Sequence, residues 1–268
     1  MSLRTPPPGG SPAGDALFDV RGRVALVTGA SSGLGEHFAE MLAARGARVY
    51  ATARRVDRLE ALVARIRAAG GDAVAIAMDV TSADSVSAAM ACIRREDSAP
   101  DIVVNNAGVA STKASLELTE ADWRGVLDTN LDGAWRVAQA SAGAMVAAGK
   151  PGSIVNIASI LGLRVAAQLL AYATAKAALV QLTKALAIEW ARHGIRVNAI
   201  APGYIQTDMN REFFATPAGQ AVVKRVPQRR IGQPADLDGA LLLLASAAGD
   251  FMTGSIVAVD GGHVVNSL

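Results

Sequence analysis

The feature that most constrains the fold of this chain is a regular alternation of short apolar runs with longer helix-patterned segments. The apolar runs are continuous rather than alternating, as expected of strands that are buried on both faces of a sheet. Strands joined by helical crossovers lie parallel, because a right-handed crossover returns the chain in the same direction. The pattern therefore predicts a single α/β domain with a doubly wound parallel sheet of seven strands flanked by helices. The predicted strands are 24–27, 47–52, 73–78, 102–104, 153–158, 195–200 and 256–259. The predicted helices are 34–45, 58–69, 82–95, 119–148, 172–192 and 234–245.

Two segments depart from this alternation. Residues 1–16 are rich in proline, glycine and serine, a composition typical of disorder, so we expect a disordered N-terminal leader there. Residues 17–268 show no break in composition and are expected to form one domain. Within this domain, residues 204–232 form a connection too long for an ordinary loop, and we expect a lid over the substrate site there.

Composition narrows the classes of function. The chain has 26 basic and 24 acidic residues, and its arginines are scattered, so we expect no nucleic acid partner. No apolar run approaches the length needed to span a membrane, so we expect no membrane partner. The single cysteine, Cys92, excludes an internal disulfide and fits a reducing, cytoplasmic location. His37, His193 and His263 lie far apart without paired ligand spacing, so we expect no metal.

A glycine-rich segment from Thr28 to Gly35 joins the first predicted strand to the first predicted helix. Glycines there allow a tight turn and a close approach of the backbone to a pyrophosphate, which the free N–H groups and dipole of a helix N-terminus attract. A loop of this kind between a strand and a helix is typical of dinucleotide binding and predicts a Rossmann-type fold. We expect the cofactor to contact the residues of this loop, namely Gly29, Ser31, Ser32, Gly33, Leu34 and Gly35.

Tyr172 and Lys176 are four residues apart in a helix-patterned segment and therefore share one helix face. A free phenol titrates near pH ~10, and an adjacent cation stabilises the phenolate and lowers that pKa. Such a pair suits the general acid/base of an alcohol–ketone conversion, although the same spacing also occurs in solvated pairs. Ser159 follows the predicted strand 153–158, where its hydroxyl faces the ligand crevice and can polarise a carbonyl.

With the glycine loop and the Tyr-x-x-x-Lys pair together, the chain resembles the short-chain dehydrogenase/reductase family from about residue 20 to residue 262. The resemblance implies a catalytic tetrad and further cofactor contacts at positions that match family motifs. The implied tetrad is Asn130, Ser159, Tyr172 and Lys176. The further implied contacts are Asp79 and Val80 at the adenine, Asn106, Ala107 and Gly108 after the fourth strand, Pro202 and Gly203 after the sixth, and Ile205 and Thr207 at the nicotinamide carboxamide.

The resemblance also implies a reaction, in which a hydride passes between a nicotinamide cofactor and a small carbonyl or secondary alcohol substrate. In it Tyr172 exchanges the proton, Lys176 lowers the tyrosine pKa and reaches the ribose hydroxyls, and Asn130 holds a water. Family members usually assemble as tetramers or dimers, so we expect a homotetramer or a homodimer.

The end of the second predicted strand bears on the choice of cofactor. Ala53 occupies the position at which NAD-preferring relatives carry aspartate, and Arg54 and Arg55 follow it. Arginine forms charge-assisted hydrogen bonds with a phosphate, so NADP(H) is favoured, with NAD(H) as the alternative. Two observations oppose this: Ser32 is neutral where some relatives add a base, and the arginines could be a solvated pair beside Asp57.

The substrate side of the sequence is less informative. The segment 160–170 is mostly apolar, and the lid adds Met209, Phe213 and Phe214, so we expect an apolar or amphipathic carbonyl compound. Arg164 is a candidate for binding a carboxylate or phosphate, or is simply solvated. One alternative activity is reduction of a 3-oxoacyl thioester, which the basic residues near the lid would favour. A remote alternative is a non-catalytic dinucleotide sensor, against which the intact Tyr172 and Lys176 pair argues.

Overall fold

The fold is built on a seven-stranded sheet in which all strands are parallel, in the order β3-β2-β1-β4-β5-β6-β7. The structure, a computed structural model, describes residues 14–207 and 210–266. This sheet confirms the predicted doubly wound Rossmann-type domain. The strands are β1 (Val24–Thr28), β2 (Arg48–Ala53), β3 (Asp72–Ala77), β4 (Ile102–Asn105), β5 (Gly152–Ile157), β6 (Ile195–Pro202) and β7 (Ile256–Val259).

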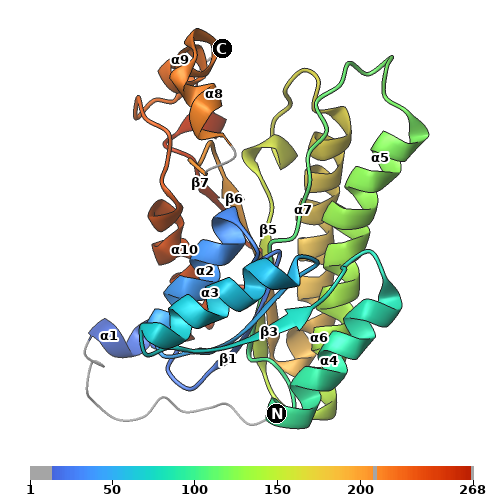
Figure 1. Cartoon of the computed structure of the whole chain (residues 1–268), viewed down its shortest axis with the longest axis vertical. Helices are drawn as coiled ribbons and strands as arrows, with labels where there is room; N and C mark the ends of the chain where they lie inside the picture. The colour runs from blue at the N-terminus through green and yellow to red at the C-terminus, as the bar shows by residue number, and fades with distance from the viewer. Residues whose placement is uncertain (1–13, 208–209, 267–268) are drawn as a thin grey trace.

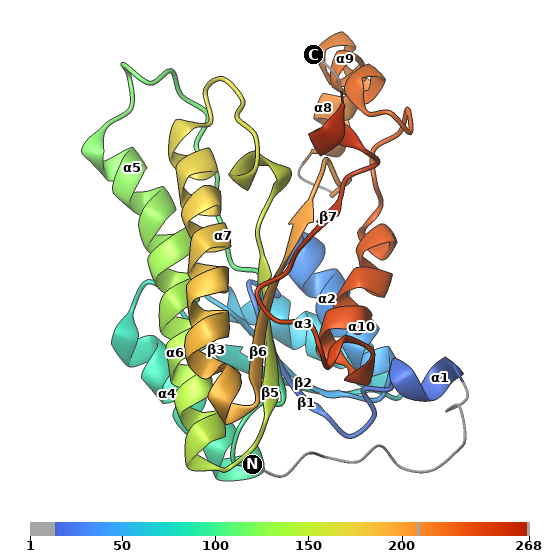
Figure 2. The ribbon, with the colours of Figure 1, turned by 180° about the vertical axis from the view of Figure 1, so that it is seen from behind.

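Helices cover both faces of the sheet (Figure 1; Figure 2, from behind). One face carries α2 (Gly33–Ala44), α3 (Val56–Ala68) and α10 (Asp238–Ala245). The other carries α4 (Ala83–Asp97), α6 (Ala134–Ala147) and α7 (Leu170–Trp190).

Strand β1 shows why the apolar runs are continuous. Val24 and Leu26 pack into the core beneath α4, α6 and α7, whereas Ala25 and Val27 pack into the core beneath α2, α3 and α10. Each residue of the strand is therefore buried on one face or the other, and a polar residue at either set of positions would lose its hydration without gaining a partner.

The strand order reverses between β1 and β4, and this switch point locates the ligand site. From β1 the sheet continues through β2 and β3 in one direction, and through β4 to β7 in the other. The connections that leave β1 and β4 at their carboxyl ends therefore diverge to opposite faces and open a crevice between them. The glycine loop follows β1, and residues 105–108 follow β4, so both motifs lie at this crevice.

The long helix predicted over 119–148 is interrupted. Thr119 caps α5 (Glu120–Leu127), since its hydroxyl accepts from the Asp122 N–H at 3.2 Å and the Asp122 carboxylate accepts from the Thr119 N–H at 3.1 Å. A π-helical turn, Asp128–Gly133, then separates α5 from α6. It contains Asn130, and turns of this type are frequent at functional sites.

The segment 204–232, predicted as irregular, contains two short helices, α8 (Arg211–Ala215) and α9 (Pro217–Arg225), beyond the carboxyl end of β6 (Figure 1). Thr216 caps α9 by accepting from the Gly219 N–H at 3.1 Å, and Pro217 occupies the first turn, where its missing N–H costs nothing. Thr216 and Pro217 are the residues from which the start of α9 could have been predicted in the sequence. The predicted lid residue Met209 lies outside the described residues.

The N-terminal boundary also differs from the prediction. Residues 1–13 of the predicted leader lie outside the described part of the chain, whereas residues 14–16 belong to a short helix, α1 (Gly14–Leu17). Among the described residues, no helix combines the length and apolar character that crossing a membrane requires.

Candidate active site

The glycine loop leaves the N-terminus of α2 open to a ligand. Ser32 precedes the helix but makes no capping hydrogen bond, so the first helical N–H groups are not capped by its side chain. Gly29 and Gly33 have φ angles of +66° and +59°, which side chains rarely adopt. A Cβ at Gly35 would lie 2.4 Å from the Gly29 carbonyl oxygen. Only glycines keep this cradle free, and its shape and exposed N–H groups fit the pyrophosphate of a dinucleotide.

Threonine and asparagine side chains hold the two sides of the crevice together. The Thr28 hydroxyl accepts from the N–H groups of Asn106 and Ala107, each at 3.0 Å, and the Asn106 amide donates to the Thr28 carbonyl at 3.0 Å. A Cβ at Gly29 would lie only 2.8 Å from the Ala107 Cα. The structure thus brings the predicted contacts Asn106 and Ala107 directly against the glycine loop, whereas Gly108 lies beside Asn130.

The Asp79 carboxylate is fixed at the carboxyl end of β3. It accepts from the N–H and the hydroxyl of Thr81 at 2.9 and 2.8 Å. Partial burial pushes the pKa of Asp79 upward, but these hydrogen bonds and the charge of Arg54 outweigh burial and leave the pKa below its ordinary value. Asp79 is therefore an ionised acceptor, and Arg54 lies within electrostatic reach of it. Val80 packs against Gly133, where a Cβ would lie 2.6 Å from the valine methyl.

Arg55 reaches back from the end of β2 to the glycine loop, a contact that the sequence did not indicate. Its Nη2 donates to the hydroxyls of Ser31 and Ser32 at 2.9 and 2.8 Å, and its Nε donates to Ser31 at 3.2 Å. The guanidinium is thus held beside the N-terminus of α2. Of the two arginines, Arg55 borders the pyrophosphate cradle and Arg54 borders Asp79.

The ammonium of Lys176 is buried within the domain. Only 4% of the residue is exposed, and its Nζ donates to the Ile157 carbonyl, at the end of β5, at 2.6 Å. The Nζ also lies over the ring of Tyr172, 5.6 Å from the ring centre. Burial lowers the pKa of Lys176 to about 8, because a charged amine is poorly solvated there.

The Ser159 hydroxyl lies close enough to Tyr172 to affect the pKa of the phenol. Burial raises the pKa of the Tyr172 phenol, and the neighbouring Ser159 hydroxyl opposes this rise. The expected lowering by Lys176 is therefore not what the free site shows. The reason is that burial lowers the pKa of Lys176 below that of the phenol, so the lysine loses its charge before Tyr172 ionises.

Asn130 is tied to the segment that follows β4. Its Oδ1 accepts from the Val109 N–H at 2.8 Å, and its Nδ2 donates to the Val109 carbonyl at 2.9 Å. Each polar group of the buried side chain therefore binds Val109, which leaves one N–H and one lone pair of the amide for a further partner such as a water.

The residues after β6 return to the glycine loop. Gly203 packs so tightly on the C-terminal segment that a Cβ would lie 2.7 Å from the Asp260 Cα. Thr207 lies near Gly33, with its methyl 3.6 Å from the position of a Cβ there. Asn210, which the sequence did not single out, fixes this turn by accepting from the Thr207 N–H and donating to the Ile205 carbonyl, both at 2.8 Å.

Arg164 is not free in a solvated loop. Its Nη1 donates to the carbonyls of His263, Val264 and Asn266 at 3.0, 3.3 and 3.3 Å. Among residues 14–207 and 210–266, no group of three or more His, Cys, Asp or Glu side chains is arranged to hold a metal ion.

Residues 29–264 match the family model described as enoyl-(acyl carrier protein) reductase. The chain belongs to the short-chain dehydrogenase/reductase family. It is accordingly an oxidoreductase that interconverts CH–OH and C=O groups with a nicotinamide cofactor.

The chain is similar to dehydrogenases of polyhydroxylated compounds. It is 42% identical to a galactitol 2-dehydrogenase (L-tagatose-forming) of Cereibacter sphaeroides, over 93% of this chain and 98% of the relative. It is 37% identical to a gluconate 5-dehydrogenase of Gluconobacter oxydans, over 93% and 98%. It is also 35% identical to a 3-oxoacyl-[acyl-carrier-protein] reductase of Vibrio cholerae, over 91% and 98%.

Among solved structures, a gluconate 5-dehydrogenase of Burkholderia cenocepacia in complex with NADP and tartrate superposes with a TM-score of 0.90. The two chains are 37% identical, and the match covers 94% of this chain and 99% of the other.

The buried Lys176 predicts a characteristic pH dependence of stability in the free protein. Its pKa falls from 10.5 to about 8 on folding, so between these values the unfolded chain binds more protons than the folded chain. The burial cost is fully present below about pH 8 and is relieved as pH rises toward about 10. We expect the wild type to gain about 2 kcal/mol of unfolding free energy relative to Lys176→Met over this window.

Chemical denaturation of both proteins at several pH values checks this expectation, because other titrating groups cancel in the difference. A difference in unfolding free energy that stays constant from pH 7.5 to 10 contradicts a buried Lys176 with a lowered pKa.

Proposed function

We propose that this protein is an NADP(H)-dependent dehydrogenase that interconverts one secondary hydroxyl of a polyol or sugar acid with a ketone. The observation that carries the proposal is the grouping of Ser159, Tyr172 and the buried Lys176, whose Nζ lies over the Tyr172 ring, at the carboxyl edge of the same sheet as the glycine loop.

The mechanism follows from the positions of these side chains. A substrate oxygen that meets both hydroxyls accepts a hydrogen bond from Ser159 and exchanges its proton with Tyr172. During oxidation the Tyr172 phenolate takes the alcohol proton, and during reduction the phenol returns it to the ketone oxygen. When bound, the nicotinamide supplies or accepts the hydride. Burial disfavours the phenolate in the free site, so the tyrosine is a proton donor until added positive charge stabilises its anion.

Lys176 acts as a positioning and electrostatic residue. Its Nζ keeps two donors beyond the one given to the Ile157 carbonyl, and these suit the hydroxyls of a ribose. Because its Nζ lies over the Tyr172 ring, Lys176 would hold a ribose close to the proton-transfer side chain.

The relatives favour a polyhydroxylated substrate over the apolar or amphipathic carbonyl compound that the sequence predicts. Galactitol and gluconate are named for two relatives of 42% and 37% identity. A 3-oxoacyl thioester remains the second candidate because of the Vibrio cholerae relative. The basic residues expected to receive an acyl carrier are partly engaged, since Arg230 pairs with Asp236 at 2.6 Å and Arg229 donates to the Lys224 carbonyl.

Arg55 and Ala53 support NADP(H) as the favoured cofactor. Ala53 puts no carboxylate at the end of β2, and Arg55 is already held beside the cradle by Ser31 and Ser32. A 2′-phosphate bound there would give the Arg55 guanidinium a charged partner in place of the neutral serine hydroxyls. The NADP complex of the Burkholderia cenocepacia relative is consistent with this choice.

A groove between the ends of α6 and α7 supports assembly of a homotetramer or homodimer. Its lining is mostly small or apolar, and consists of Gln139, Ala142, Gly143, Val146, Ala147, Trp190 and His193. Small residues would let the matching helices of a second copy approach closely. For the location we propose the cytoplasm, which the single cysteine supports.

Removal of the phenol hydroxyl separates proton transfer from binding. We expect Tyr172→Phe to lower kcat by about 100-fold or more, as loss of a general acid/base does, and to leave the NADPH dissociation constant nearly unchanged. Steady-state kinetics and fluorescence titration measure the two effects. Tyr50→Phe is the matched control because its hydroxyl contacts Asp97 instead of Ser159, and it should keep its turnover. Wild-type turnover in Tyr172→Phe contradicts the assignment.

The two arginines after β2 should differ in their effect on cofactor choice. We expect Arg55→Gln to lower the preference for NADPH over NADH by about tenfold or more, since it removes a charge-assisted bond to the 2′-phosphate. Arg54→Gln should have a smaller effect, because Arg54 lies toward Asp79. The ratio of kcat/KM for the two cofactors measures the preference. A wild-type preference for NADH overturns the proposal.

The proposed interface can be tested at Gly143, where a Cβ would meet no atom within 4 Å. We expect Gly143→Arg to fold normally and to sediment as a smaller species than the wild type, because the new side chain fills the groove. Ala64→Arg, on the exposed side of α3, is the control and should retain the wild-type mass. A monomeric wild type, or a Gly143→Arg protein of unchanged mass, contradicts the interface.

A further inference from the structure

A single arginine joins two parts of the substrate side that are far apart in the sequence. The serine loop, residues 159–169, connects β5 to α7, and the C-terminal segment, residues 260–266, follows β7. Arg164 of the serine loop donates from Nη1 to three carbonyls of the C-terminal segment, those of His263, Val264 and Asn266. In the described part of the chain these are all the side-chain hydrogen bonds of Arg164. The Nη1 of this half-buried guanidinium thus binds a segment about 100 residues away.

The C-terminal segment in turn contacts the lid through aromatic rings. The His263 ring lies 5.4 Å from the Tyr204 ring, and the Tyr204 ring meets that of Phe214 edge-on at 5.9 Å. Phe214 belongs to α8 and is itself packed on Phe213 at 5.2 Å. Asp260 fixes the shape of the segment, because its carboxylate accepts from the N–H groups of Gly262 and Val264 at 2.9 and 2.5 Å.

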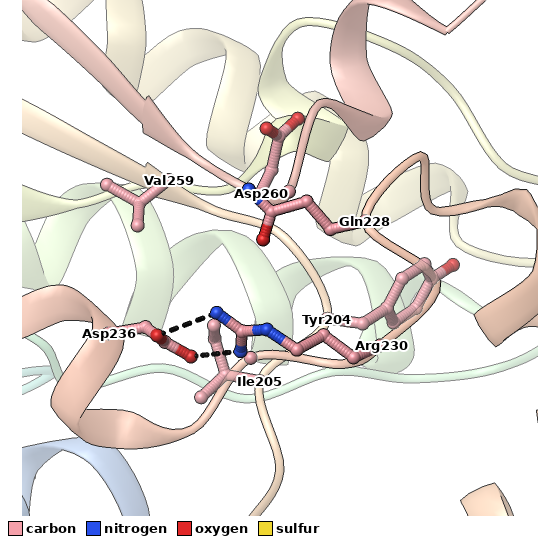
Figure 3. A pocket seen from close by; sticks show the side chains of 9 residues that line it. Tyr204, Ile205, Gln228, Arg230, Asp236, Val259 and Asp260 are labelled. Atoms are coloured by element: carbon pink, nitrogen blue, oxygen red, sulfur yellow. Dashed lines mark hydrogen bonds and ion pairs between the residues drawn. The ribbon is translucent and has the colours of Figure 1, made fainter.

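The neck of the lid is closed independently of these contacts. Ile205 and Gly232 form a β-bridge, with the Gln206 N–H donating to the Gly232 carbonyl at 2.8 Å. Figure 3 shows the adjoining pocket, across which Arg230 binds the Asp236 carboxylate through two hydrogen bonds of 2.6 and 2.9 Å. The C-terminal segment thus contacts the lid through these aromatic rings at α8 and through the Asn266 amide, which donates to the Arg225 carbonyl at the end of α9 at 2.8 Å.

We propose that Arg164 is a positioning residue for the substrate, which holds the C-terminal segment, and through His263 and Tyr204 the lid, against the loop that carries Ser159. The inference rests on the proposed function, in that the substrate binds at Ser159 and Tyr172 between these segments. The arginine acts on the walls of the substrate site. It therefore affects substrate affinity, and leaves proton transfer at Tyr172 and cofactor binding at the glycine loop largely intact.

The chemistry of the side chain explains why arginine is needed. Its charge strengthens each hydrogen bond to a carbonyl, and its rigid planar group holds the one donating nitrogen, Nη1, in a fixed direction toward the three acceptors. A lysine would supply the charge as a single flexible point and could follow only part of this arrangement. The conservative variant should therefore restore part of the effect.

Two measurements on Arg164→Met, Arg164→Lys and the control Arg45→Met test the proposal. The first is amide hydrogen exchange without substrate, in which we expect Arg164→Met to exchange faster in residues 260–266 and 211–225 and unchanged in the sheet. The second is steady-state kinetics, in which we expect Arg164→Met to raise the KM for the polyol or sugar acid about tenfold. We expect kcat and the NADPH dissociation constant to stay within about threefold of the wild-type values. Arg164→Lys should fall between wild type and Arg164→Met, and Arg45→Met, an exposed arginine at the end of α2, should match the wild type.

The outcomes separate positioning from plain structural support and from failure of the proposed function. The role of Arg164 is overturned if exchange in the two segments is unchanged, or if exchange becomes faster throughout the sheet. It is also overturned if exchange becomes faster in the two segments while the KM stays unchanged. Exchange requires no substrate, so it still decides this role if the wild type oxidises no polyol or sugar acid, a result that would contradict the proposed function alone.

Discussion

The structure depends above all on a buried cation, the ammonium of Lys176 bound to the Ile157 carbonyl at the end of β5. Burying a charge of this kind costs roughly several kcal/mol unless donors and acceptors are well matched, so the surroundings must hold it accurately. The turn after Ser159 is pressed onto α7 for this reason, and a Cβ at Gly162 would lie 2.7 Å from the Lys176 carbonyl oxygen. The same close approach brings Ser159 to Tyr172, and the acid/base pair is a consequence of it.

The cofactor half of the site is joined to this centre through buried polar side chains. Thr28 and Asn106 connect the glycine loop to the end of β4, and Asn130 connects the next residues to the π-helical turn. Deeper in the sheet, Asn105 donates to Asn156 at 2.9 Å, and Asn156 donates to Thr183 of α7 at 2.9 Å. Polar chains of this kind restrict how neighbouring elements slide, because each displaced partner would be left unsatisfied. They keep the nicotinamide side and the proton-transfer side in one geometry.

Sequence periodicity was sufficient for the sheet and the glycine loop, because buried strands and a strand–loop–helix junction each leave a local signal. It was insufficient for the π-helical turn at Asp128–Gly133, since a shift of hydrogen bonding by one residue leaves the same apolar pattern. The five-residue α8 is too short to show a period. Arg54 and Arg55 looked alike because the direction of a side chain at a strand end is set by its tertiary neighbours. The partners of Arg164 lie 99 to 102 residues away, beyond any local pattern.

The central claim is that the hydride and the proton meet one substrate carbon–oxygen bond held by Ser159 and Tyr172. The most direct test is a single turnover of the wild type with NADPH deuterated at the transferable position and a panel of keto sugars and keto sugar acids that includes L-tagatose. We expect a product alcohol that carries one deuterium on its new carbinol carbon. Bound NADPH that keeps its deuterium with every member of the panel would contradict the account.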